Sequence, residues 1–300
     1  MKRSPTLCWA TRPCRQYSRV AGVIRRARKA KQSAELLGSG RYQMSHNLLS
    51  VEIVDKLEES VSQPALARLA DHLAYFKFIQ ETLLVAFKNG DVPLQTSNVS
   101  VNPKPFVYIS TTRAFSISKI AMEITIRGYP QEGMALTRTL FELFHSTQYL
   151  ARHPNLINDY LLGTLKLEKI LKMAKMEDPE IDMSSFGRFW GLMSRYSHAS
   201  PDLLALTLTA KEGNKVEASL VVSDPKRIDD TVYGIMSALF MQYLFFRFTL
   251  KNDFSVTPQL RERDRYIFDP ANIRRFTGLS SFSNEELAQI YPFIASEANH

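Results

Sequence analysis

The sequence has few cysteines and few glycines, and each scarcity excludes a class of protein. Both cysteines, Cys8 and Cys14, lie near the start, so the rest of the chain has neither a disulfide framework nor a thiolate metal site. The 12 glycines form no phosphate-cradling loop. This composition fits a reducing compartment, and we expect a cytoplasmic protein.

The sequence also lacks a long apolar run and the common signatures of enzymes. Residues 232–246 carry no charge, but this stretch is shorter than the ~20 residues that span a bilayer. We therefore expect a central bundle helix there and no membrane span. No His-Glu-x-x-His, Gly-x-Ser-x-Gly or clustered His/Cys set is present, so we expect neither a metal nor a cofactor.

The basic charge belongs to the beginning of the chain. The formal net charge is +8 overall, but residues 1–43 carry +10 and residues 44–300 carry −2. The body is therefore close to neutral, so the basic overall charge is no argument for a core that binds nucleic acid. We predict that residues 1–43 are a basic, disordered extension; a targeting sequence, a phosphate-binding arm, or a true start at Met44 are the alternatives.

Helical periodicity dominates the body and predicts a mainly α fold, a bundle of six to seven helices over residues 44–250. Residues 251–300 are expected to form a tail that packs on the bundle. Pro64 should open the second helix, and Asp229 or Asp230 should cap the last one. The expected helices cover about 48–61, 64–87, 105–127, 131–152, 154–175, a shorter segment ending near 197, and 231–250, with a small helix at 284–290 and a β-hairpin-like excursion near 203–222.

Four polar side chains fall in register on the helix expected over 131–152. Arg138, Glu142, His145 and Tyr149 lie within about 60° of one another, with large apolar residues on the opposite side. Glu142 is one turn from both Arg138 and His145, so it could pair with the guanidinium and orient the imidazole. A histidine near its intrinsic pKa suits acid–base catalysis. The alternative is a solvated face with an intrahelical ion pair.

Two further polar groups could extend this stripe. One comprises Ser194, Arg195, Ser197 and His198. If its helix packs beside the stripe, His145 and His198 would share a cleft suited to a phosphodiester; a structural histidine at a helix end is the alternative. The other comprises Lys119, Glu123 and Arg127, which predict either a charged surface or a buried network in which Glu123 faces Arg138.

The Arg138-x-x-x-Glu142 pattern followed by Ser194-Arg-Tyr-Ser-His198 resembles a widespread bacterial all-helical family defined only as a domain of unknown function, over about residues 60–250. The Arg138 and His145 pair is more distantly similar to the HEPN helical ribonucleases of toxin and phage-defence modules. That resemblance implies metal-independent RNA cleavage, with His145 in acid–base work and Arg138 on the phosphate. The chain departs from the pattern at Thr139 and has no second copy of the motif.

These features support two functions. The first is an interaction or accessory protein with a polar pocket, in a bacterial defence or stress context, whose partner is another protein. The second is a HEPN-like metal-independent ribonuclease or related phosphate-handling enzyme that acts on RNA. In the second case Arg138, Glu142, His145 and His198 would be catalytic, and a homodimer could complete the site.

Overall fold

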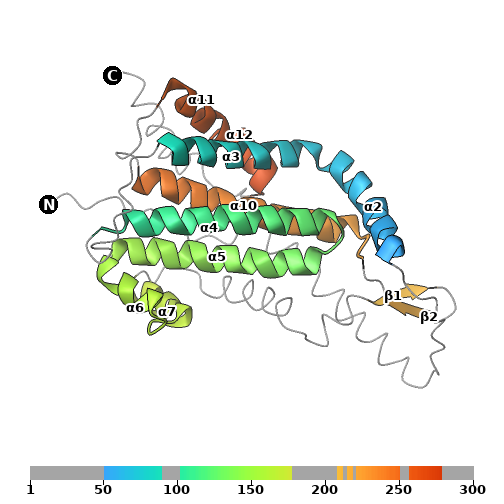
Figure 1. Cartoon of the computed structure of the whole chain (residues 1–300), viewed down its shortest axis with the longest axis horizontal. Helices are drawn as coiled ribbons and strands as arrows, with labels where there is room; N and C mark the ends of the chain where they lie inside the picture. The colour runs from blue at the N-terminus through green and yellow to red at the C-terminus, as the bar shows by residue number, and fades with distance from the viewer. Residues whose placement is uncertain are drawn as a thin grey trace.

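The computed structural model describes residues 51–89, 102–177, 208–211, 215–218, 221–250 and 257–278, and it confirms the mainly α fold (Figure 1). Its helices are α2 (Val51–Arg68), α3 (Ala70–Asn89), α4 (Lys104–Ile126), α5 (Pro130–Arg152), the 3-10 turn η2 (Pro154–Leu156), α6 (Ile157–Leu161), α7 (Leu167–Glu177), α10 (Pro225–Thr249), α11 (Pro258–Ile267) and α12 (Pro270–Thr277). The expected basic extension and the helices near 186–197 and 284–290 lie outside the described residues.

Strands β1 (Leu208–Lys211) and β2 (Lys215–Ala218) pair antiparallel, within the stretch where the sequence predicts a hairpin-like excursion.

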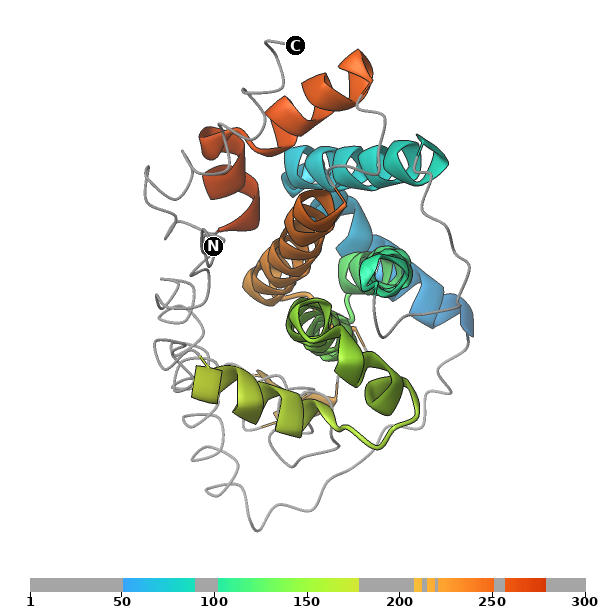
Figure 2. The ribbon, with the colours of Figure 1, turned by 90° about the vertical axis from the view of Figure 1, so that its left-hand side faces the viewer.

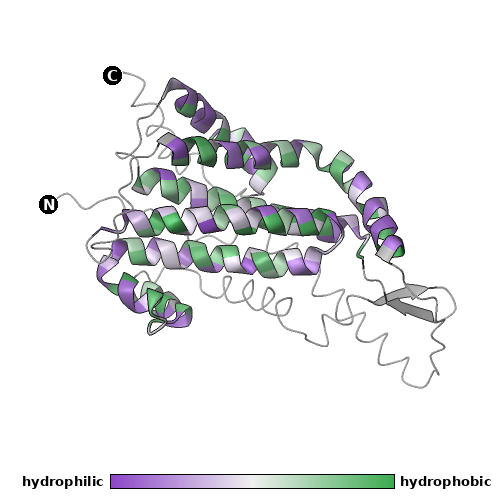
Figure 3. Cartoon of the chain, viewed as in Figure 1, coloured by the Kyte–Doolittle hydropathy of each residue, from purple (hydrophilic) through white to green (hydrophobic). Residues whose placement is uncertain are grey.

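Helix α10 is the centre of the bundle. It packs against α3, α4, α5 and α12 (Figure 2), and its residues Ile235, Leu239, Phe240 and Tyr243 are fully buried. Apolar residues recur along all the packed helices, while α11 is largely hydrophilic (Figure 3). The prediction that residues 232–246 form a central bundle helix is confirmed. In the part of the chain that the structure describes, no helix combines the length and apolar character needed to cross a membrane.

Small residues let α5 approach α4 and α10 closely. A Cβ atom added at Gly133 would overlap Oγ1 of Thr125 on α4, and one added at Gly234 on α10 would lie 3.2 Å from Cγ2 of Thr137 on α5. The two threonine hydroxyls donate within their own helices, to the carbonyl oxygens of Ala121 (2.6 Å) and Gly133 (2.8 Å). The threonines therefore satisfy their polar groups without a partner across the interface.

The connection between α4 and α5 follows the predicted break. Gly128 has a φ of 97°, a conformation that glycine adopts most easily, and Pro130 is the first residue of α5. The Gly128 carbonyl accepts a hydrogen bond from the Val222 amide at 2.8 Å. This short corner makes α4 and α5 antiparallel neighbours, as the sequence predicts.

Two predicted helix starts are wrong. Pro64 lies inside α2, which continues to Arg68. A proline removes only its own backbone amide as a donor, and the following residues still form helical hydrogen bonds, such as the one from the Leu69 amide to the Ala65 carbonyl. Helix α10 begins at Pro225 rather than near residue 231, because Asp224 already caps it by accepting from the Lys226 amide at 3.0 Å.

The single helix expected over 154–175 is interrupted. Gly163 adopts a φ of 75° after α6, and the amides of Thr164 and Leu165 both donate to the carbonyl of Asp159 at 3.0 Å. These bonds close the end of α6 and turn the chain before α7 begins.

The C-terminal region contains α11 and α12, two helices that the sequence reasoning missed. Each begins with a capping residue followed by proline: Thr257 accepts from the Leu260 amide at 3.2 Å, and Asp269 accepts from the Ala271 amide at 2.8 Å. The Tyr75 hydroxyl of α3 donates to the Ile267 carbonyl of α11 at 2.7 Å. The two helices thus pack on the α3 and α10 side of the bundle.

A buried ionic cluster fastens α11 to α10. Oδ2 of Asp264 lies 2.6 Å from Nη2 of Arg247, and Oδ1 accepts a hydrogen bond from the Tyr243 hydroxyl. The exposed fractions of Asp264 and Arg247 are 5% and 3%, and burial raises the pKa of Tyr243. Because both charges are withdrawn from water, removing either side chain would leave the other charge buried without this compensation.

Candidate functional site

Helix α5 carries the polar stripe, and its first two members pair with each other. Nε of Arg138 donates to Oε1 of Glu142 at 2.9 Å, and the two side chains are 20% and 29% exposed. The intrahelical pair that the spacing predicts is therefore formed. Such a pair contributes a few tenths of a kcal/mol, and it compensates the two charges locally.

His145 lies one turn further along α5 and is partly buried. Its ring packs against the adjacent Phe144, with 5.2 Å between ring centroids. Loss of hydration lowers the pKa of His145 to about 4. The imidazole is therefore neutral at physiological pH, in contrast to the near-intrinsic pKa that the sequence reasoning assumed.

Tyr149, at the end of the stripe, belongs to a separate cluster that joins α5 to α7. Its hydroxyl donates to Oε1 of Glu177 at 3.3 Å, while Nε2 of His153 lies 2.9 Å from Oε2 of the same carboxylate. The Tyr149 and His153 rings stack at 4.4 Å, and burial raises the pKa of Tyr149. Sequence reasoning missed His153 and Glu177, because Glu177 is placed by the packing of α7 across α5 (Figure 2).

Glu123 lies on the outer surface of α4. Its carboxylate accepts from Nη2 of Arg127 at 3.2 Å, and both side chains are more than half exposed. Arg127 also approaches Glu58 of α2, at 3.6 Å. The buried network in which Glu123 faces Arg138 is therefore wrong, and the charged-surface interpretation agrees with this geometry.

The remaining candidates, Ser194, Arg195, Ser197 and His198, lie outside the described residues. The cleft that would unite His145 with His198 thus stays a prediction. Among the described residues, no cluster of three or more His, Cys, Asp or Glu side chains could hold a metal ion.

No family model, no curated protein and no solved structure matches this chain. The resemblances to the helical family of unknown function and to the HEPN ribonucleases therefore stay predictions.

Proposed function

We propose that this protein is a helical interaction or accessory protein, and that the α5 stripe stabilises the bundle and its contacts rather than performing catalysis. The observation that carries the proposal is the environment of His145. With a pKa of about 4, this histidine stays neutral across the physiological range. A neutral, partly buried imidazole fits packing and hydrogen bonding better than proton transfer.

The ribonuclease alternative needs a histidine that gives and takes a proton near neutral pH. With a pKa of about 4, only about one His145 in a thousand would be protonated at pH 7. The other proposed catalytic group, Arg138, already pairs with Glu142. Both facts lower the expected catalytic power of the stripe.

A protein partner suits the surface better than RNA does. Ile109 and Ile120 are 57% and 54% exposed and stand three turns apart on one face of α4. Two apolar side chains spaced along one helix face are compatible with a protein contact, whereas an RNA surface needs an excess of positive charge. Residues 44–300 carry a net charge of −2.

An RNA cleavage assay without metal tests this proposal. The full chain is incubated with single-stranded and structured RNA in the presence of a chelator, alongside His145→Ala and Arg138→Ala. We expect no cleavage above the protein-free control for any of the three, because His145 is neutral near pH 7 and is therefore a poor proton donor for the α5 stripe. Cleavage by the wild type that is lost in His145→Ala would overturn the proposal and favour the ribonuclease.

A further inference from the structure

The turn between α6 and α7 presents two adjacent leucines to solvent. Leu161 ends α6 and is 61% exposed, and Leu162 follows it and is 78% exposed. Met176, near the end of α7, is 75% exposed. Among the large apolar side chains that the structure describes, these three are the most exposed. Residues 161–165, which we call the leucine turn, therefore form a small apolar tip in water.

The leucine turn is fixed to the bundle on both sides and closed by its own hydrogen bonds. Ile157 before it and Leu165 at its end are buried in an apolar cluster with residues of α5 and α7. The amides of residues 162–165 all donate to carbonyl oxygens of α6, at 2.9 to 3.0 Å. An unpaired amide is costly in apolar surroundings. Because these amides are already paired, the turn can leave water without losing their hydrogen bonds.

Three lysines follow the leucine turn. Lys166, Lys169 and Lys172 are exposed, and their spacing of three residues places them within about 120° of one another around α7. No ion pair joins any of the three to another residue in the part of the chain that the structure describes. Residues 157–172 contain these three lysines and two acids, Asp159 and Glu168. The segment therefore keeps a small excess of positive charge beside its apolar tip.

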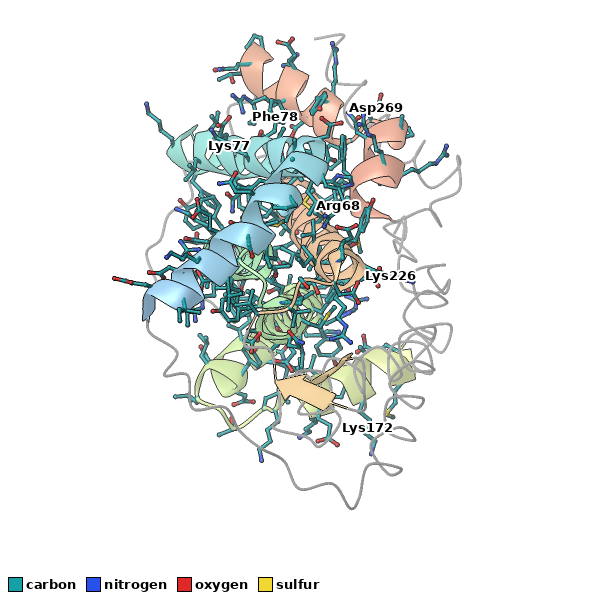
Figure 4. The ribbon with its side chains drawn as sticks, turned by 90° about the vertical axis from the view of Figure 1, so that its right-hand side faces the viewer. Arg68, Lys77, Phe78, Lys172, Lys226 and Asp269 are labelled. Atoms are coloured by element: carbon teal, nitrogen blue, oxygen red, sulfur yellow. The ribbon has the colours of Figure 1, made fainter. Side chains whose placement is uncertain are left out.

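The leucine turn and α7 lie on the side of the bundle opposite α11 and α12 (Figure 2). Helix α7 packs against α5 and buries Ile170 there. Lys172 lies about 160° from Ile170 around the helix, and Figure 4 shows it on α7, again opposite α11 and α12. One side of the molecule thus combines exposed leucines with lysines that have no acidic partner.

We propose that the leucine turn inserts into an anionic lipid surface, with Lys166 and Lys169 at the level of the headgroups. The two leucines leave water for the apolar layer, while the lysines reach the phosphates through their flexible stems. A fluid lipid surface accepts a projecting tip, whereas a protein partner would need a groove that matches it. This contact is separate from the protein contact proposed for α4.

The basic start of the chain supports the same choice of surface. Residues 1–43 carry a net charge of +10, and clustered lysines and arginines are attracted to anionic lipid. Stable attachment to a membrane takes two signals, and an apolar anchor together with a polybasic segment is one such combination. The leucine turn therefore supplies insertion and orientation, and the basic segment supplies attraction.

Hydrogen exchange of the full-length wild-type chain tests the inference without any variant. Exchange is compared with and without vesicles of phosphatidylcholine that contain about 30% phosphatidylglycerol. We expect the amides of residues 157–166 to exchange at least roughly twofold more slowly on the vesicles, with α11 and α12 unchanged. Two results would overturn the inference: no binding to these vesicles, or bound protein in which residues 157–166 exchange as they do in solution.

Variants of the full chain separate insertion from attraction in sedimentation with the same vesicles. The double change Leu161→Ser and Leu162→Ser should weaken binding roughly tenfold or more, and Lys166→Gln with Lys169→Gln should weaken it roughly tenfold at low salt. Ile109→Ser on α4 is the matched control, because it removes a side chain that is 57% exposed, and it should bind as the wild type does. Unchanged binding by the double leucine variant would contradict insertion.

A second copy of the chain is the competing occupant of the leucine turn. Light scattering without lipid distinguishes it from the lipid surface. We expect the wild type and the double leucine variant to have the same molar mass per particle. A dimeric wild type and a monomeric double leucine variant would overturn the inference, because the leucines would then be covered by another copy.

Discussion

Gly133→Ala is expected to destabilise the protein by about 3 kcal/mol, the upper part of the range for overpacked cores. The added methyl group would overlap Oγ1 of Thr125 and lie 3.1 Å from Cγ2 of Thr231, so it would force α5 away from both α4 and α10. Thr125 is fully buried and bonded to the Ala121 carbonyl, which leaves it little room to move. In a helix with free space around the glycine, replacing it by alanine would stabilise the protein by up to about 1 kcal/mol. The sign of the measured change in unfolding free energy therefore distinguishes close helix packing from open space.

Urea unfolding followed by circular dichroism measures this effect, and Gly163→Ala is the matched control. Gly163 has no atom within 4 Å of an added Cβ, but its φ is 75°. The Gly163→Ala variant should therefore be destabilised only by backbone strain, which costs about 1 kcal/mol. In a Thr125→Ala background, Gly133→Ala should cost less than in the wild type, because the overlapping oxygen is gone. A Gly133→Ala protein as stable as the wild type would show that the helices are not packed this closely.

Asp264→Ala should cost about 3–5 kcal/mol, the typical loss when one partner of a buried ion pair is removed. The change leaves Arg247, 3% exposed, without its carboxylate, and it removes the acceptor of the Tyr243 hydroxyl. Adding Arg247→Met should recover part of the loss, because it removes the buried positive charge that the Asp264 carboxylate compensates. Unfolding by urea gives each free energy.

The exposed pair on α4 is the control for the buried cluster. Glu123→Ala breaks the ion pair between Glu123 and Arg127, whose side chains are 57% and 54% exposed, respectively. This change should lower the free energy of unfolding by about 1 kcal/mol or less. If Asp264→Ala cost no more than Glu123→Ala, the Arg247 and Asp264 charges could not be buried together.

The sequence predicted the parts of the fold that depend on neighbours along the chain. The corner at Gly128 and Pro130 located the ends of α4 and α5, and the spacing of Arg138 and Glu142 predicted their ion pair. The sequence did not predict α11, because one of its three buried positions is the charged residue Asp264. Leu260 and Ile267 alone do not give the apolar spacing that identifies a helix. Arg247 and Tyr243 of α10 compensate the buried Asp264 carboxylate.

The properties of the candidate site depended on packing, which spacing on one helix does not reveal. The pattern placed His145 in register with Glu142, but its pKa is set by how far the folded protein withdraws it from water. The cluster of Tyr149, His153 and Glu177 was hidden for the same reason, because α7 brings Glu177 to α5 from outside the helix that carries the stripe.

Titration of His145 by NMR tests the proposed role of the stripe most directly. The carbon-bound imidazole protons are followed from pH 8 to about pH 2.5, so that the whole transition is covered, with the signal assigned by its absence in His145→Gln. We expect no change in chemical shift between pH 8 and about pH 5.5, and a midpoint near 4. A midpoint between about 6 and 7 would contradict a neutral, structural His145, because it would restore an acid–base group at physiological pH.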